Sequence, residues 1–223
     1  MTTLSESLFI AYCGQRGYAC ERIEEAQTER RADFEVVTGD TTVLVEIKEF
    51  TPNPEDREQA RSMRERGEAG GTFDGLRIRG AIEKAAGQLR RARTTAQPAV
   101  LLLHDNIVVD GVRPYMVNYV FNPTLLEWGM YGDHVAVFEV PAHGRAIDCG
   151  DKRGGNRQLM PDARNYISAV LLLTRGTDGP YVWAFHNFFA KTKLPRSAFS
   201  GPGDRHFRNP SDPLTGPVGW ENF

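Results

Sequence analysis

Two carboxylates and a lysine lie close together in two apolar, β-branched runs near the start of the chain. The runs are Ala32–Thr38 and Thr41–Lys48, and a Gly-Asp dipeptide separates them. Two connecting residues with glycine first are typical of a type II′ turn, so we expect an antiparallel hairpin. In the register that this turn sets, Asp33 lies opposite Glu46 on one face of the hairpin.

The other face of the predicted hairpin is apolar, because Phe34 faces Val45 and Val36 faces Val43. Facing side chains on adjacent strands have Cβ atoms about 4.5–5.5 Å apart, and like charges at that distance are destabilising. A pair of carboxylates there calls for a compensating charge. A divalent cation would supply it, since hard oxygen ligands suit Mg²⁺ or Mn²⁺.

Lys48 follows Glu46 by two residues, so it projects from the same face one pleat further along. The run before it is otherwise apolar and is typical of a central strand that is covered on both sides. A lysine beside a metal-bound water can orient that water or neutralise charge that develops on a phosphate oxygen. The competing interpretation is a solvated rim, where strands commonly end in charged residues.

The elements that would position these groups are readable from the apolar spacing. Leu4–Gln15 is predicted to be a helix buried over a wide arc and stopped by a glycine, and Tyr18–Ile23 a short strand. Residues 53–67 form a charged helix or loop, Ile78–Thr95 an amphipathic helix and Pro98–His104 an apolar strand. The predicted order of the first half is αβββαβ.

This order and two short motifs resemble the PD-(D/E)xK nuclease superfamily, which has the restriction-endonuclease-like fold. The motifs are Arg-Ala-Asp-Phe at residues 31–34 and Val-Glu-Ile-Lys at residues 45–48, and the resemblance covers residues 4–104. Ala32 stands where the family often has proline. The resemblance implies that Asp33, Glu46 and the main-chain carbonyl of Ile47 bind Mg²⁺ or Mn²⁺, and that Lys48 assists catalysis.

Two further residues match positions that members of this superfamily use. Glu6 shares an apolar stripe of the first helix with Cys13, although a first-turn glutamate favoured by the helix dipole would look the same. Gln88, flanked by Ala85, matches a glutamine on the helix after the Glu-x-Lys motif; alternatively it only borders the buried face. Rival third carboxylates are Glu21, Glu24 and Glu25.

The second half of the chain is predicted to add strands to the same domain. The expected elements are strands at Tyr115–Phe121, Val135–Val140, Ile167–Thr174 and Tyr181–Phe188, with a short helix at Pro123–Met130. We expect a glycine-rich loop at Asp148–Arg157 and irregular structure from Pro195 onward, with Trp220 and Phe223 holding that tail to the body. The fold class is therefore α/β, with a restriction-endonuclease-like αβββαβ core, a mixed central sheet and additional C-terminal strands. Residues 1–223 are expected to form one domain, with a core at 4–104 and an extension at 105–223.

Composition narrows the class of protein. Of the 223 residues, 40% are hydrophobic and 25% charged, which is typical of a globular protein. The formal net charge of −2 excludes a generic polybasic nucleic-acid coat, so phosphate contacts would come from local basic segments, at 77–93 and 191–208. These segments could equally be a solvated helix face and a basic tail. Three scattered cysteines and the lack of a signal-peptide or membrane-spanning pattern predict a cytoplasmic protein that binds no membrane.

Together these features predict a metal-dependent phosphodiester hydrolase, a nuclease that acts on nucleic acid, with DNA as the favoured substrate. The competing hypothesis is a non-catalytic relative that binds nucleic acid or another protein. The choice between DNA and RNA, the sequence specificity and the formation of a homodimer stay open.

Overall fold

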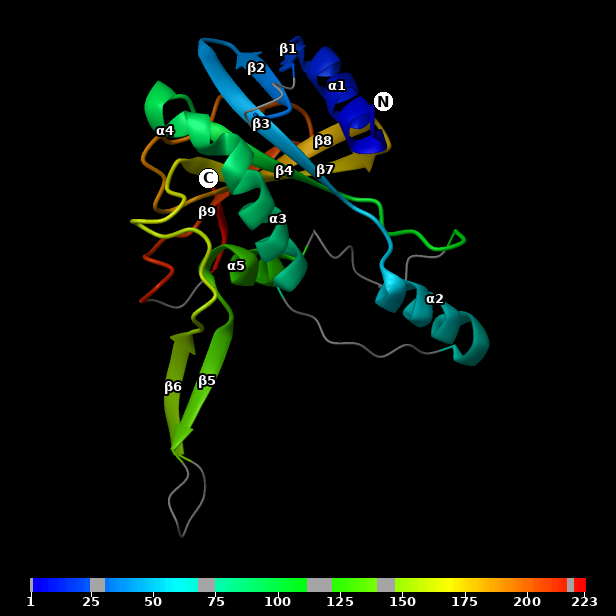
Figure 1. Ribbon diagram of the computed structural model, residues 1–223, viewed down its shortest axis with the longest axis vertical. Coiled ribbons are helices and arrows are strands. Elements are labelled where there is room, and N and C mark those ends of the chain that lie inside the picture. Colours follow the sequence, from blue (N-terminus) through cyan, green and yellow to red (C-terminus); the bar gives the residue numbers. More distant parts are fainter. Residues whose placement is uncertain (1, 25–30, 68–74, 112–121, 140–146, 216–218) are drawn as a thin grey trace.

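The computed structural model describes residues 2–24, 31–67, 75–111, 122–139, 147–215 and 219–223. These ranges hold five α-helices, an eight-stranded mixed sheet and a separate two-stranded ribbon (Figure 1). The protein is therefore of the mixed α/β class. None of the helices in these ranges is long and apolar enough to cross a membrane. The predicted strand at Tyr115–Phe121 lies outside the described residues.

The first four elements follow the predicted order. Helix α1 (Leu4–Arg16) is followed by β1 (Ala19–Arg22), β2 (Phe34–Thr38) and β3 (Thr41–Phe50). Helix α1 begins at a capping box in which the Thr3 side chain accepts from the N–H of Glu6 while the Glu6 carboxylate accepts from the N–H of Thr3. The helix ends at Gly17, whose φ of 68° is readily adopted only by glycine.

Strands from both halves of the chain build one continuous sheet. The later strands are β4 (Ala99–Asp105), β7 (Ile167–Gly176), β8 (Gly179–His186), β9 (Arg205–Arg208) and β10 (Glu221–Asn222). The order across the sheet is β1-β2-β3-β4-β7-β8-β9-β10. Strands β3, β4 and β7 run parallel, while β2 and β8 pair antiparallel with β3 and β7. Strand β3 is thus a central strand, as its apolar run predicted.

The helices after β3 differ in part from the prediction. Residues 53–67 do form a helix, α2 (Pro54–Arg66), with Asn53 as its N-cap. The single helix expected at Ile78–Thr95 is divided into α3 (Leu76–Gln88), a 3₁₀ turn (Leu89–Arg91) and α4 (Ala92–Thr95). This tightening comes at the C-terminal end of α3, where 3₁₀ turns are common. Helix α5 (Pro123–Tyr131) matches the predicted short helix.

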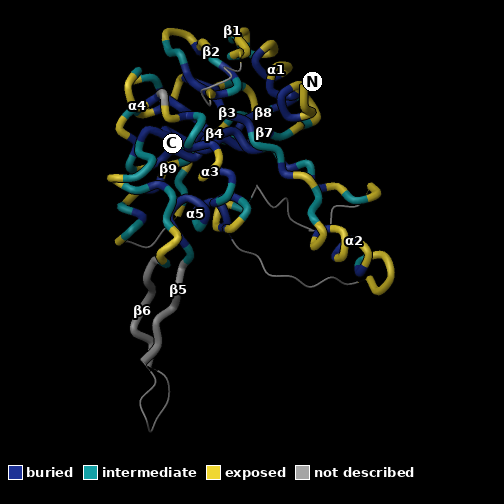
Figure 2. Tube along the Cα trace, in the orientation of Figure 1, coloured by how far each residue is buried: buried dark blue, intermediate teal, exposed yellow. Residues whose placement is uncertain are grey.

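Two apolar layers cover the two faces of the sheet, and Figure 2 shows the central strands as buried. Helix α1 packs on one face through Phe9 and Tyr12. Its buried arc is narrower than predicted, because Leu4 and Ile10 are about half exposed. Helices α3 and α5 cover the other face. They approach so closely that a Cβ at Gly129 would lie 2.4 Å from the Cγ2 atom of Ile78.

Two predictions for the second half were wrong. Strand β6 (Ile147–Arg153) occupies most of the segment expected to be a loop and pairs with β5 (His134–Glu139). Strands β9 and β10 lie in the tail expected to be irregular. In each case backbone pairing with a neighbouring strand supplies the hydrogen bonds, so a recognisable apolar pattern is not required. The predicted strands matching β5, β7 and β8 are confirmed.

The tail is held to the body by the two aromatic residues that were expected to hold it. The indole N–H of Trp220 donates to the carbonyl of Pro123 at 3.0 Å, and its ring packs edge-on against Phe185. The ring of Phe223 lies 5.0 Å from that of His186 at the end of β8. The C-terminal residues therefore belong to the packed structure.

Candidate active site

The β2–β3 hairpin has the predicted register. Phe34 pairs with Val45 and Val36 with Val43, while Gly39 has the positive φ (63°) that the first position of a type II′ turn requires. The ladder of paired residues ends at Phe34, one residue after Asp33. Asp33 therefore lies just outside the β2–β3 ladder, at the end of the hairpin that is away from the turn.

The Asp33 carboxylate bonds to the backbone of β3. Its Oδ2 atom accepts from the N–H of Ile47 at 2.7 Å. In a strand the N–H and C=O of one residue point to the same edge, so the carbonyl of Ile47 also points to the edge beyond the end of β2. Burial raises the pKa of Asp33, against the lowering effect of the Ile47 bond and the Lys48 charge. The two groups implied as ligands, the Asp33 carboxylate and the Ile47 carbonyl, thus share one edge.

Glu46 is a carboxylate inside the protein, with no exposed surface. Burial, and next the negative charge of Asp33, raise its pKa to about 8. A hydrogen bond with the Asp33 side chain also raises the pKa. Its Oε1 atom accepts from the ammonium of Lys48, whereas its buried Oε2 atom has no donor in the described part of the chain. Such a group is unfavourable in an ordinary structural position, because a buried oxygen left without a partner costs about 1–3 kcal/mol.

Lys48 projects from the same face as Glu46, as its spacing predicted, and connects β3 to helix α3. Its ammonium bonds to Glu46 and donates to the side-chain oxygen of Gln88 at 3.0 Å. Gln88 is the last residue of α3, so the packing of this helix on the sheet positions the lysine. The lysine side chain keeps 26% of its surface exposed, so it is reachable from solvent.

Glu6 is buried at the start of α1, and both of its carboxylate oxygens are in use. Its Oε2 atom accepts from the N–H of Thr3, and its Oε1 atom forms an ion pair with Arg22. Its negative charge contributes to the raised pKa of Asp33, which places it near the site. The rivals Glu21 and Glu24 are exposed on and just after β1, and Glu25 lies outside the described residues.

The residues present fit a divalent cation, although they form a small ligand set. Nowhere in the described ranges do three Asp, Glu, His or Cys side chains gather into one group that could hold a metal. The available donors are the carboxylates of Asp33 and Glu46 and the carbonyl of Ile47. The unpartnered Oε2 of Glu46, facing a second carboxylate, is the observation that favours a cation here.

The basic segment at 77–93 divides into structural and exposed cations. Arg77 pairs with Asp56, and Arg79 pairs with Asp133. Among the described basic residues of this segment, Lys84, Arg90 and Arg93 have exposed side chains. Arg90 and Arg93 line a cavity together with Arg164 and the carboxylates of Glu83 and Asp162. Part of the predicted phosphate-binding surface is therefore committed to holding helices in place.

Sequence reasoning missed Arg22, which pairs with Glu6 and stacks over the ring of Phe34 at 5.6 Å. No local spacing links residues 6 and 22, because the contact arises only when β1 packs beside α1.

Comparison with other proteins adds no further evidence. No protein-family model, curated protein or solved structure matches the chain.

Proposed function

We propose that this protein is a metal-dependent nuclease of the PD-(D/E)xK type, with a restriction-endonuclease-like core, and that it hydrolyses phosphodiester bonds in DNA. The observation that carries the proposal is the buried Glu46 beside Asp33, with one carboxylate oxygen unpartnered and a lysine on the same face. Active sites commonly retain such local conflicts, which structural positions avoid.

Asp33, Glu46 and the carbonyl of Ile47 would hold Mg²⁺ or Mn²⁺. The cation would polarise a phosphate oxygen and lower the pKa of a bound water. The protein prepares this site before any ligand binds, because the Ile47 N–H holds the Asp33 carboxylate in place. Burial of Glu46 excludes competing water from its free oxygen.

Lys48 supplies positive charge at the same place. Its ammonium is held between Glu46 and Gln88, two acceptors on different elements, so its position is fixed before substrate arrives. Preorganised charge of this kind stabilises developing negative charge better than a mobile group does. Gln88 acts in this proposal as a positioning residue through Lys48.

The substrate would be held by exposed cations rather than by the overall charge of the protein. Lys84, Arg90 and Arg93 lie on the same helical segment as Gln88, and their side chains are exposed. Such residues suit contacts with a phosphate backbone. A polyanionic substrate is thus compatible with the net charge of −2.

The second candidate function is a non-catalytic module that binds nucleic acid or protein. The observation that favours it is the neutralisation of the site by its own residues. Lys48 already compensates Glu46, and the carboxylate of Glu6 is occupied by Thr3 and Arg22. A site of this kind would persist without a metal, so metal binding discriminates between the two candidates.

The test is a cleavage assay with linear, circular and single-stranded DNA and a structured RNA, each with Mg²⁺, Mn²⁺ or chelator. We expect the parent protein to cut DNA with either metal and to stop with chelator. Asp33→Asn should abolish cleavage, while Glu55→Gln, at an exposed position of α2, should leave it intact. Intact substrates throughout, together with no calorimetric binding of Mn²⁺, would support the non-catalytic module instead.

A further inference from the structure

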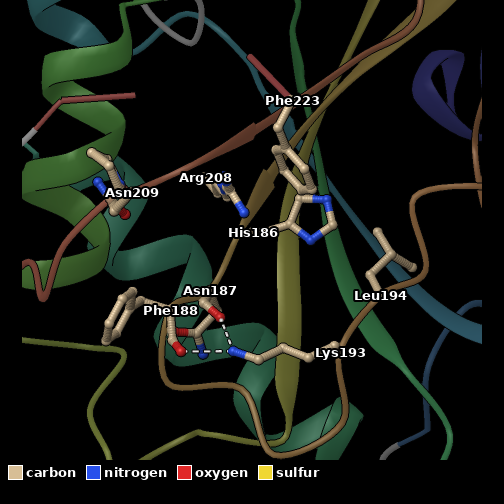
Figure 3. A pocket seen from close by; sticks show the side chains of 9 residues that line it. His186, Asn187, Phe188, Lys193, Leu194, Arg208, Asn209 and Phe223 are labelled. Carbon is tan, nitrogen blue, oxygen red and sulfur yellow. Dashed lines mark hydrogen bonds between the residues drawn. The ribbon is translucent and has the colours of Figure 1, made fainter. Parts of the chain in front are cut away.

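A cavity of about 560 Å³ lies where β8 and β9 end, among residues that the proposed nuclease does not use (Figure 3). Its walls come from the last residues of the two strands, from the segment after β8 and from the C-terminal residues. The lining residues are His186, Asn187, Phe188, Lys193, Leu194, Arg208, Asn209, Pro210 and Phe223.

The cavity is separate from the candidate active site. Across the sheet, the row of paired residues that contains Glu46 reaches Phe185 on β8, three strands away. At the usual strand spacing this is about 14 Å. His186 is the next residue along β8, so its side chain projects from the opposite face of the sheet to that of Phe185. A ligand in this cavity would therefore occupy a second site.

The cavity favours an anion. Lys193 and Arg208 line it, and none of its nine lining side chains is acidic. The Nε atom of Arg208 is paired with Glu221 at 2.6 Å, so Lys193 supplies the cation that has no carboxylate partner among the described residues. The ammonium of Lys193 donates to the carbonyls of Phe188 at 2.7 Å and Asn187 at 3.3 Å, which uses two of its three protons. Figure 3 shows these two bonds, which join Lys193 to the first residues after β8. The third N–H of the ammonium has no acceptor among the described residues, so it is available to a ligand.

The polar groups at the back of the cavity are neutral. Burial, and next the nearby His206 and Lys193, lower the pKa of His186 to about 3. His186 shares a hydrogen bond through Nε2 with Nδ1 of His206 at 2.8 Å, so only its Nδ1 atom is left for a ligand. The amide of Asn187 is held in place, because it donates to the carbonyl of Ile167 and accepts from the N–H of Phe189. A ligand would thus meet positive charge on one side and an uncharged imidazole on another.

Apart from the amide of Asn209, the remaining walls are apolar and partly aromatic. Phe188 is 38% exposed, which is unusual for a phenylalanine and leaves part of its ring open. The guanidinium of Arg208 lies 4.9 Å from the centre of the Phe223 ring. Bases stack on aromatic rings of this kind, and such contacts are worth about 1–3 kcal/mol each. The volume falls within the usual range of small-molecule sites.

We propose that this cavity binds a single nucleotide, with its base against Phe188 and its phosphate at Lys193 and Arg208. An inorganic anion would make no use of the exposed ring of Phe188. An apolar ligand would make no use of the positive charges of Lys193 and Arg208. A free mononucleotide and an unpaired nucleotide at the end of a strand share this chemistry. The proposal stands without the nuclease proposal, because none of the residues of the candidate active site lines the cavity.

Calorimetric titration of the full chain tests the proposal with three probes: deoxyadenosine 5′-monophosphate, deoxyadenosine and inorganic phosphate. We expect the nucleotide to bind at least about tenfold more tightly than either fragment, since it engages both halves of the site. Equal binding of inorganic phosphate would show an anion site only and would overturn the proposal. Two duplexes, one with single-nucleotide overhangs and one with blunt ends, identify the source. Preference for the overhang supports a strand end, and binding of the mononucleotide without that preference supports a free nucleotide.

Substitutions locate the binding to this cavity. Lys193→Met and Phe188→Ala should each weaken nucleotide binding by about tenfold. Both residues are exposed, and a thermal melt of each variant checks that the fold persists, because Lys193 also bonds to two backbone carbonyls. Lys191→Met makes the same change of charge two residues away, outside the cavity lining, and should leave the affinity unchanged. Asp33→Asn should also bind the nucleotide like the parent. Unchanged affinity in Lys193→Met and Phe188→Ala would place the binding elsewhere and refute the proposal.

Discussion

Replacing Glu46 by glutamine should stabilise the metal-free protein at neutral pH. The pKa of Glu46 is about 8 in the folded state, against an ordinary value of 4.5. The folded state therefore holds this proton more tightly than the unfolded chain does. This contribution to the free energy of unfolding is fully present below about pH 4.5 and is lost as the pH rises through about 8.

The size of the effect follows from the two pKa values. At pH 7 the unfolded carboxyl is ionised while the folded one is largely protonated, and each unit of difference corresponds to about 1.4 kcal/mol. The 2.5 units between 4.5 and pH 7 give an upper bound of about 3 kcal/mol. Glutamine avoids this loss, because it does not titrate, and its side-chain oxygen can still accept from Lys48. Cation at about 1,000 times Kd should reverse the order, since binding at that concentration stabilises the parent by about 4.1 kcal/mol, more than the upper bound of about 3 kcal/mol.

Urea unfolding of both proteins at pH 5 and pH 7.5, with chelator and then with excess Mg²⁺, measures how their free energies of unfolding depend on pH and on the cation. In chelator, the free energy of unfolding of Glu46→Gln should increase relative to that of the parent as the pH rises from 5 to 7.5. Glu83→Gln, the same chemical change on an exposed face of α3, should track the parent at both pH values. If Glu46→Gln were less stable than the parent at pH 7.5 in chelator, and Mg²⁺ left that order unchanged, Glu46 would be a structural partner and the metal-site argument would be wrong.

Three further outcomes are expected. Asp33→Asn should weaken Mn²⁺ binding in calorimetric titration. Lys48→Ala should still bind Mn²⁺ but should cleave DNA at least about a hundredfold more slowly. Equal loss of Mn²⁺ binding in the two variants would contradict the role of the lysine. Gln88→Ala should slow cleavage by about tenfold with Mn²⁺ affinity unchanged, because it removes one of the two acceptors that hold that lysine; full activity would show that the other acceptor suffices. Gly129→Ala should lower the free energy of unfolding by about 1–3 kcal/mol, since its Cβ would overlap a side chain of α3. Gly80→Ala, with open space around it, is the matched control, and it should be neutral or stabilising.

The parts of the fold that the sequence predicts well are those determined by local signals. The turn at Gly39 and the alternation on either side of it determine the register of β2 and β3. That register in turn places Asp33 at the end of the hairpin and Lys48 on the face of Glu46. The helix stop at Gly17 is equally local, because a positive φ there needs glycine.

The parts that could not be predicted depend on contacts between distant segments. The bond from Lys48 to Gln88 joins residues 40 positions apart and exists only once α3 packs on the sheet. Strand β9 has only four residues, among prolines and glycines, and forms because β8 offers it an open edge. The cavity beside it joins the ends of these strands to Phe223, a combination that no motif signals.

The parallel pairing of β4 with β7 has a consequence for how the chain folds. The residues between these strands, 106–166, must all be made before the pair can close. Pairing across such a separation is slow, because the entropy of loop closure is lost before any contact forms. The hairpin that holds Asp33 and Glu46 closes over two residues, so it can form first. During synthesis, β4 would then present an apolar and unpaired edge until β7 emerges, and such edges promote association between chains. We therefore expect a folding intermediate that has the hairpin formed and the edge of β4 unpaired, and that associates with other chains more readily as the protein concentration rises.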